Sequence, residues 1–274
     1  SKIDWLMGMA NADLGQKPIT EITSPMVLHT LKKVEARGNY ETAKRLRSQI
    51  GAVLRFAIAN GLAENDPTFA LRDALISVKP TPRAAITNKK ALGGLMRAID
   101  GFDGQVTTRI ALNLLAIVAT RPGELRHARW EEFDLDQAVW TIPAKRMKMR
   151  KPHSVPLPKQ ALELLEELKM LTGWGQLIVP SIRSSIRPMR ENTLNAALRR
   201  MGYGGDEMTS HGFRATFSTI ANESGLWNPD AIERALAHVE SNRVRGAYAR
   251  GEFWEERVRI ADWWSGMLVE LRSN

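Results

Sequence analysis

The sequence contains no cysteine, which excludes disulfide bonds and zinc sites built on thiolates. It has no Gly-rich phosphate loop of the GxxxxGK[ST] type, which argues against an NTP-driven motor. No cluster of carboxylates has the spacing needed to hold two metal ions, which disfavours a metal-dependent nuclease or transposase. Nor does the first part of the chain offer the nucleophilic serine of a serine recombinase.

Long hydrophobic runs are also missing. The longest apolar stretch, residues 110–119, is interrupted by Asn113 and is far too short to span a bilayer. The first residues show no basic segment followed by a long apolar run, so we see no secretory signal. Together with the lack of cysteine, these features predict a soluble protein of a reducing cytoplasm with no membrane partner.

The charge is less ordinary than the rest of the composition. With 39 Lys and Arg against 30 Asp and Glu, the 274-residue chain has a formal net charge of +9, whereas its hydrophobic content of 43% is that of a globular protein. A strongly basic balance indicates a polyanionic partner, most often nucleic acid. The length is sufficient for two domains.

Residues 1–78 have the pattern of an all-helical domain. One helix is predicted to start at Ser24 as N-cap, with a proline directly after it, and to stop at Gly38. A longer helix is predicted from Tyr40 to a stop at Gly61. A short third helix should follow Asp66-Pro67. The expected apolar face of the long helix is Leu46, Ile50, Val53, Leu54, Ala57 and Ile58. Basic residues that suit a DNA-facing surface are Lys32, Lys33, Arg37, Lys44, Arg45, Arg47 and Arg55.

Residues 79–86 read as a basic, Pro-rich linker, because two prolines favour extended backbone and prevent a helix from crossing. A second domain is then expected over residues 87–274. Thr87 or Asn88 should cap a helix that ends near Asp100, and a strongly apolar helix is predicted for 105–119.

Two strands are predicted in the second domain, over residues 138–143 and 154–157. The basic loop from Lys145 to His153 would connect them as a hairpin, with His153 on the surface. Further helices are expected at 159–171, 191–201, 211–223, 230–238, 242–250 and 253–271. The fold class is therefore mainly α with a small antiparallel β-sheet.

One segment concentrates residues suited to phosphodiester chemistry. It contains His211, Arg214, His238 and, in a basic stretch, Tyr248. Arginines can neutralise a phosphate, a histidine can move a proton, and a phenol can form a covalent intermediate, so this set can attack a phosphodiester without a metal. Of the three tyrosines in the chain, only Tyr248 has basic and histidine neighbours.

A further arginine, Arg121, follows the apolar helix at the edge of the core. Glu124, three residues later, is an obvious ion-pair partner. Two interpretations remain open: a surface salt bridge, or a carboxylate that steers Arg121 toward a substrate.

These motifs, in this order, resemble the tyrosine recombinases, specifically the integrases of phages, prophages and genomic islands. The segment Arg121-Pro122-Gly123-Glu124-Leu125-Arg126 resembles the family's first arginine motif, and His211-Gly212-Phe213-Arg214 its His-x-x-Arg motif. The closing histidine–tyrosine segment would be 236–248, and the hairpin would carry the catalytic lysine. Residues 1–78 resemble the helical core-binding domain and 87–274 the catalytic domain.

The resemblance implies a role for each residue. Arg121 and Arg214 would hold the scissile phosphate, Tyr248 would attack it to give a 3′-phosphotyrosyl link, and Lys148 would protonate the leaving 5′ oxygen. His211 would assist proton transfer and His238 would hydrogen-bond the phosphate. Lys145 and Lys151 remain alternatives to Lys148. No metal or nucleotide cofactor is implied.

The implied partner is double-stranded DNA with an attachment-site core sequence, bound by a homotetramer, with accessory DNA-bending proteins in some reactions. The amphipathic helix after Tyr248 would dock on a neighbouring subunit; docking on its own domain is the alternative. Two other functions stay open, a catalytically inert DNA-binding regulator and a type IB topoisomerase. The sequence shows no separate arm-site-binding domain, which leaves open whether it is a fragment of a longer integrase.

Overall fold

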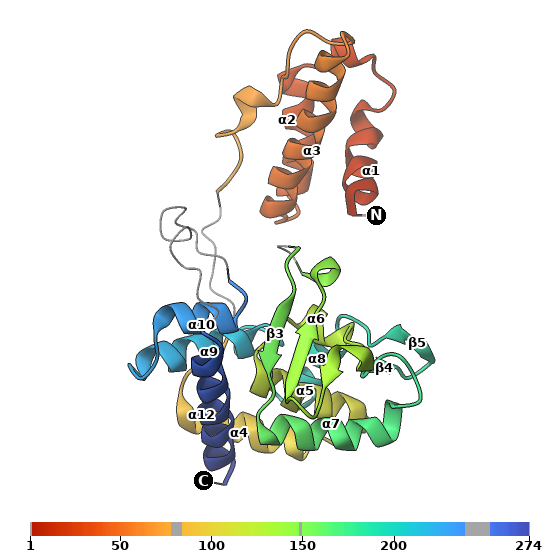
Figure 1. Ribbon diagram of the computed structural model, residues 1–274. Coiled ribbons are helices and arrows are strands. Elements are labelled where there is room, and N and C mark those ends of the chain that lie inside the picture. Colours follow the sequence, from red (N-terminus) through yellow and green to blue (C-terminus); the bar gives the residue numbers. More distant parts are fainter. Residues whose placement is uncertain (1, 78–83, 148–149, 239–252, 274) are drawn as a thin grey trace. The chain divides into compact units, whose positions relative to one another are not determined.

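The computed structural model describes residues 2–77, 84–147, 150–238 and 253–273. The chain packs into two compact units, residues 1–81 and 82–274 (Figure 1). Lys148, Tyr248, the helix expected at 242–250 and most of the expected linker lie outside the described residues. Nowhere in the described ranges is a helix both long and apolar enough to cross a bilayer.

The first unit is a bundle of three helices, α1 (Lys2–Leu14), α2 (Ser24–Glu35) and α3 (Tyr40–Ala59), which pack on one another (Figure 1). Two 3₁₀ turns, Ile19–Glu21 and Phe69–Leu71, complete it. The buried residues recur at helical spacing, as a bundle requires. They are Leu6, Ala10, Leu14, Val27, Leu31, Val34, Ala43, Leu46, Ile50, Leu54, Leu71 and Leu75.

Two details of this unit correct the sequence-based expectation. The N-cap of α2 is Thr23, because Ser24 is already helical and its hydroxyl donates to the carbonyl of Pro67 at 2.8 Å. Val53 is 44% exposed, so the apolar face of α3 is narrower than its apolar residues indicate. The predicted stops at Gly38 and Gly61 are confirmed, since both have the positive φ that favours glycine.

The second unit is built around α5 (Val106–Val118), which packs against α4 (Lys89–Asp100), α7 (Lys159–Thr172), α8 (Thr193–Arg200) and α9 (Gly212–Glu223). Burial of α5 on nearly every side from residue 110 onward explains why residues 110–118 are apolar apart from Asn113. Of the two caps considered for α4, the structure has Asn88, whose side chain accepts from the backbone N–H of Ala91 at 3.0 Å. The remaining α-helices within the described residues of this unit are α6 (Pro122–Arg126), α10 (Pro229–Ala235) and α12 (Trp254–Ser273).

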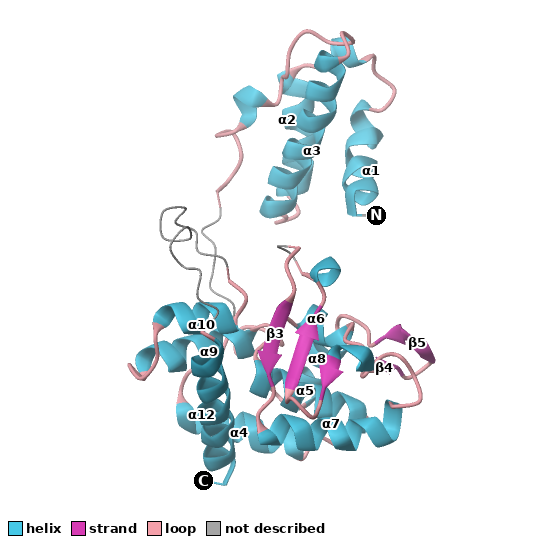
Figure 2. Ribbon diagram, viewed as in Figure 1, coloured by secondary structure: helices cyan, strands magenta, loops and turns pink. Residues whose placement is uncertain are grey.

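A three-stranded antiparallel sheet lies on this helical body (Figure 2). Its order is β1 (Phe133–Asp134), β2 (Val139–Ile142), β3 (His153–Pro156), with Ile142 opposite His153. The predicted β2–β3 hairpin is confirmed, and with it the mainly α fold class. Strand β1 and a second small hairpin, β4 (Pro180–Ser181) and β5 (Ser184–Pro188), were not predicted: β1 and β4 have only two residues each, and no residue of β5 is buried, so β5 shows no alternation of buried and exposed positions.

The C-terminal helix α12 packs within its own unit, against α4, α5, α10 and β3. Ile260, Trp264 and Leu268 are buried, and the indole N–H of Trp264 donates to the carbonyl of Ala116 at 2.8 Å. The guanidinium of Arg257 donates to the carbonyl of Ser154. Within a single chain, the core of the catalytic unit therefore covers the apolar face of the helix, which is the arrangement given above as the alternative to docking on a neighbouring subunit.

Candidate active site

Arg121 is held rigidly at the start of α6. The preceding helix α5 ends at Ala119, whose left-handed conformation (φ 48°) turns the chain sharply. Both the backbone N–H and the guanidinium of Arg121 then donate to the buried carboxylate of Glu124, at 2.8 and 2.7 Å. The expected ion pair is therefore formed, but it is not a surface salt bridge, because the Glu124 carboxylate is buried and fixes the orientation of Arg121.

Arg214, on α9, is only 8% exposed and connects the ends of two other helices. It donates to the carbonyl of Ala119 at 2.8 Å and to that of Leu236 at 2.6 Å. Arg121 reaches the next carbonyl along, that of Ala237, at 3.3 Å. The last carbonyls of a helix lack partners within it and attract cations, which explains why two arginines converge on the end of α10.

His238 follows this helix end directly and contacts Arg214. Its Nε2 lies 3.0 Å from Nη2 of Arg214, and its Nδ1 lies 2.8 Å from the carboxylate of Glu233. A guanidinium can only donate, so Nε2 accepts and the proton of a neutral ring belongs on Nδ1, facing Glu233. Glu233 was not predicted from the sequence as a partner of His238.

His211 lies at the N-cap of α9 and lines a cavity of about 450 Å³ together with Arg121. The glycine of the His-Gly-Phe-Arg motif has a packing reason: a Cβ at Gly212 would run into the backbone carbonyl of Ala84. Glycine therefore lets the start of α9 approach the backbone at Ala84, in the segment that precedes α4. The cavity is lined by Arg121, Pro122, Gly123, Glu124, Arg126, Arg146, Met147, Glu191, Asn195, Ser210 and His211.

Arg146 is a residue of this cavity that the sequence analysis did not single out. Its guanidinium forms a buried ion pair with Glu132 (side chains 14% and 5% exposed) and donates to the carbonyl of Glu124 at 2.9 Å. The indole N–H of Trp140 donates to the same Glu132 carboxylate at 3.1 Å. Burial lowers the pKa of Arg146, while the carboxylates of Glu132 and Glu124 oppose that shift.

His153, expected on the surface, is instead largely enclosed beside the arginines. Burial lowers the pKa of His153 to about 4, and the positive charges of Arg257, Arg214 and Arg121 act in the same direction. A hydrogen bond with the backbone of Ala235 opposes the shift. Strand alternation could have revealed this position, because His153 shares a face of β3 with the buried Val155.

Four of the six predicted catalytic residues are thus brought together. Arg121 and His211 line one cavity, and Arg121, Arg214 and His238 meet at the end of α10. Lys148 and Tyr248 lie outside the described residues, so their positions stay predictions. The alternative lysines, Lys145 and Lys151, are both exposed and do not line the cavity. Across the described ranges, no three His, Asp or Glu residues gather as a metal site would require.

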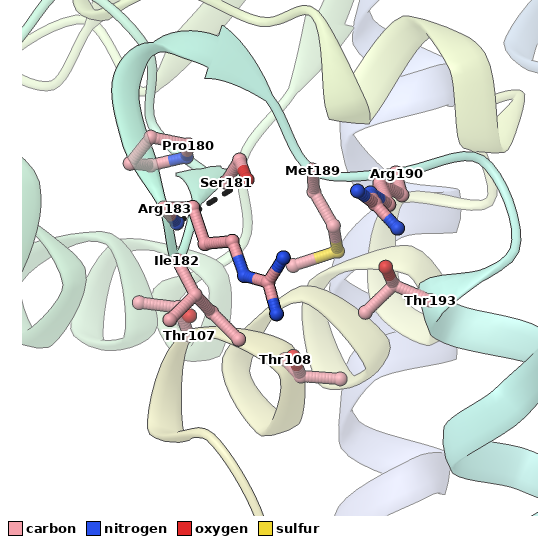
Figure 3. A pocket seen from close by; sticks show the side chains of 9 residues that line it. All are labelled: Thr107, Thr108, Pro180, Ser181, Ile182, Arg183, Met189, Arg190 and Thr193. Atoms are coloured by element: carbon pink, nitrogen blue, oxygen red, sulfur yellow. Dashed lines mark hydrogen bonds between the residues drawn. The ribbon is translucent and has the colours of Figure 1, made fainter.

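A second pocket, of about 190 Å³, lies between the β4–β5 hairpin and the starts of α5 and α8 (Figure 3). The side chain of Arg183 extends over the helix start at Thr108, and Arg190 lies beside Thr193 (Figure 3). None of the six predicted residues lines this pocket. The cavity at Arg121 is therefore the candidate active site.

Two family models match almost the whole chain. Residues 1–74 match the phage integrase central domain, and residues 86–253 match the phage integrase family. The chain belongs to the phage integrase family. The resemblance read from the arginine, histidine and tyrosine motifs is confirmed.

Curated relatives of this integrase-family chain include the integrase of Enterobacteria phage P4, 38% identical over 269 residues, and the prophage integrase IntA of Escherichia coli K12, 38% identical over 255 residues. Each match covers 93% of this chain and 61% of the relative. The chain therefore spans about three fifths of the length of these relatives.

Solved structures share its fold at lower sequence identity. A lambda integrase dimer bound to a COC′ core site has a TM-score of 0.69 and 20% identity, covering 92% of this chain and 87% of that one. The Tn1549 transposon integrase in complex with circular intermediate DNA has a TM-score of 0.67 and 16% identity, covering 94% and 91%. These likenesses establish the fold.

Proposed function

We propose that this chain is the part of a site-specific DNA recombinase that cuts and rejoins DNA strands, integrating or excising a prophage or genomic island in the bacterial cytoplasm. Residues 1–78 would bind duplex DNA at the attachment-site core, and residues 87–274 would carry the chemistry. The observation that supports this most directly is the convergence of Arg121, Arg214 and His238 at the end of α10, next to a cavity that His211 lines.

The two arginines would hold the non-bridging oxygens of the scissile phosphate and stabilise the charge of the pentacoordinate transition state. Both are oriented before DNA arrives, Arg121 by Glu124 and Arg214 by carbonyl groups. Orientation by fixed partners reduces the reorganisation needed when the phosphate enters. In the described structure, the guanidinium of Arg121 uses two of its five N–H donors on protein partners, which leaves donors for a phosphate.

Tyr248 would attack phosphorus through its phenolate, forming a phosphorus–oxygen bond to the 3′ side while the bond to the 5′ oxygen breaks. Lys148 would give its proton to that leaving oxygen, and His211 would accept the phenol's proton. The bond energy stays in the phosphotyrosine, so a 5′-hydroxyl of a second strand can reverse the step without ATP. For His238 to donate to the phosphate, its Nε2 must carry a proton, whereas in the described structure Nε2 accepts from Arg214 and Nδ1 faces Glu233.

We further propose a homotetramer acting on two duplexes, helped in some reactions by DNA-bending proteins. A lambda integrase tetramer bound to a Holliday junction has the same fold, with a TM-score of 0.69 at 21% identity. In such a tetramer, the C-terminal helix α12 would contact a neighbouring subunit through the residues that its own unit leaves uncovered.

The test uses a nicked suicide duplex carrying an attachment core, with EDTA present, and looks for a DNA-linked protein band on a denaturing gel. The chain has three tyrosines, so Tyr248→Phe can be compared with Tyr40→Phe and Tyr203→Phe as matched controls. We expect all four proteins to shift the DNA on a native gel and only Tyr248→Phe to lose the covalent band. Binding without any covalent band would support an inert regulator instead, and relaxation of plasmids lacking the core sequence would support a topoisomerase.

A further inference from the structure

Two polar side chains in the wall of the cavity at Arg121 have hydrogen-bond donors that no described residue uses. They are Arg126, the last residue of α6, and Asn195, on α8. Both line the same cavity of about 450 Å³ as Arg121 and His211. The proposed chemistry uses neither of them, although both border the space that the scissile phosphate would enter.

The guanidinium of Arg126 is held at one nitrogen and open at the other two. Its Nε donates to the carbonyl of Met189, a buried residue, at 2.8 Å. This bond joins α6 to the segment that precedes α8 and fixes the plane of the guanidinium. Of the five N–H donors of an arginine, four therefore remain on the terminal nitrogens of Arg126, and no described residue accepts from them. Two terminal nitrogens in a fixed plane match two oxygens of a phosphate.

The positive charge of Arg126 is only partly compensated by its surroundings. Burial lowers the pKa of Arg126, and the negative charge of Glu191 acts in the opposite direction without restoring the ordinary value. Glu191 is exposed, and within the described ranges it forms no ion pair with Arg126. The other carboxylate of the cavity wall, that of Glu124, is already paired with Arg121. A phosphate that enters the cavity would therefore stabilise the charge of Arg126.

The side-chain amide of Asn195 is oriented by the residue that precedes His211. Its oxygen accepts from the backbone N–H of Ser210, a buried residue, at 2.8 Å. A backbone N–H can only donate, so the amide oxygen has to face Ser210 and the NH₂ group takes the other position. Asn195 is half-buried, and no described residue accepts from this NH₂ group. Asn195 thus has two N–H donors to offer to an acceptor in the cavity.

We propose that Arg126 and Asn195 form a second phosphate subsite, which binds a phosphate of the DNA backbone close to the scissile one. The inference rests on the proposed recombinase function, in which Arg121 holds the scissile phosphate. The unused groups of Arg126 and Asn195 are all donors, and a phosphate presents only acceptors, whereas the bases together present donors as well.

The spacing along the chain indicates which phosphates are within reach. Arg126 follows Arg121 by five residues, and five residues of helix advance about 7.5 Å. Consecutive phosphates of one strand advance about 3.4 Å along the duplex axis. The second subsite should therefore face a phosphate within about two nucleotides of the cleaved bond.

The test combines protein variants with duplexes in which one phosphate is replaced by an uncharged methylphosphonate. The replacement is made at the scissile position and, one at a time, at each phosphate up to about two nucleotides to either side. Affinity for the unnicked core duplex is measured on native gels at one salt concentration. If Arg126 binds one of these phosphates, loss of the arginine and loss of the phosphate charge remove the same interaction, so the two effects do not add.

We expect Arg126→Met to weaken binding of the all-phosphate duplex by about tenfold. One flanking methylphosphonate should weaken wild type by a similar factor and leave the affinity of Arg126→Met unchanged within about twofold. Asn195→Asp keeps an acceptor for Ser210 but puts a carboxylate where the two donors were. This variant should also bind the all-phosphate duplex more weakly, and the same methylphosphonate should restore most of the lost affinity.

Two matched controls make the same chemical changes outside the cavity wall. Arg129→Met removes a partly exposed cation, and Asn192→Asp adds a negative charge at an exposed position just before α8. Neither residue lines the cavity. We expect each control to change the affinity for every duplex by the same factor, whichever phosphate is neutral.

Additive losses for Arg126→Met at every flanking phosphate would overturn the proposal. Coupling at the scissile phosphate alone would also overturn it, because Arg126 would then share the phosphate of Arg121. The wild-type comparison needs no mutation and Asn195→Asp retains the contact with Ser210, so a folding defect of Arg126→Met does not remove the test. Binding without a covalent band would count against the proposed chemistry alone, since coupling is measured from affinity, whereas no binding of the duplex at all would overturn both.

Discussion

Protonation of His153 should destabilise the catalytic unit as the pH falls. The folded-state pKa of His153 is about 4, below its ordinary value of 6.5, because burial and three arginines oppose the charged ring. Between these two values the unfolded chain binds a proton that the folded chain does not. The stabilising contribution of the neutral ring is therefore complete above pH 6.5 and is lost as the pH falls toward 4.

The size of the effect follows from the two pKa values. A shift of one pKa unit corresponds to about 1.4 kcal/mol, so the full effect is about 3 kcal/mol, reached only below pH 4. At pH 5 the unfolded histidine is almost fully protonated and the folded one is not. Between pH 8 and pH 5, His153 alone should lower the free energy of unfolding by about 2 kcal/mol.

Urea unfolding followed by tryptophan fluorescence measures this, because seven of the eight tryptophans lie in residues 82–274. The comparison is wild type against His153→Asn and His153→Gln, each at pH 8, 6 and 5. The isosteres do not titrate, so their loss of stability between pH 8 and pH 5 should be smaller than that of wild type by about 2 kcal/mol.

Parallel pH curves for wild type and both isosteres would refute the reasoning, since they would mean that His153 titrates alike in the folded and unfolded chains. A uniform drop in the stability of both variants at every pH would only measure the loss of the hydrogen bond between His153 and the backbone of Ala235. The deciding quantity is the difference between wild type and the variants in how steeply the free energy of unfolding changes with pH.

Three further changes test the packing that positions the site. Trp264→Ala removes an indole that is 1% exposed and hydrogen-bonded to Ala116, and should cost roughly 3–5 kcal/mol in urea unfolding. Gly212→Ala forces a methyl group against the Ala84 carbonyl; we expect a loss of about 1–3 kcal/mol in the same assay and slower covalent-complex formation, whereas wild-type values would show that the start of α9 can shift freely. Asn88→Ala removes the cap of α4 and should cost about 1 kcal/mol, with Asn88→Asp retaining most of the stability; equal losses for both would argue against the cap.

The fold was predictable where periodicity is strong. An apolar run interrupted once indicates the buried helix α5, and alternating residues around a basic loop indicate β2 and β3. The packing of α12 was not predictable, because an amphipathic pattern defines an apolar face without saying which surface covers it. The two-residue strand β1 is too short for any pattern.

The site was predictable to the extent that its residues occur in sequence motifs. Arg121, His211, Arg214 and His238 were found this way, and the structure brings them together. The supporting residues Arg146, Glu132 and His153 were missed because each acts through a contact made only on folding. No local sequence pattern predicts that Arg146 pairs with a buried Glu132 or that His153 contacts the end of α10. Lys148 and Tyr248 stay predictions.

Two alanines in left-handed conformation present carbonyls to the site arginines: Ala119 to Arg214 and Ala237 to Arg121. Each such residue carries roughly 1 kcal/mol of backbone strain. Since the arginines bind main chain, the side chains at these positions can diverge among relatives without moving the guanidinium groups. The permitted substitutions are residues that tolerate a left-handed backbone, such as Gly, Asn or Asp. Val, Ile or Pro would force the backbone out of this conformation, which would move the carbonyl and so displace the arginine that it binds.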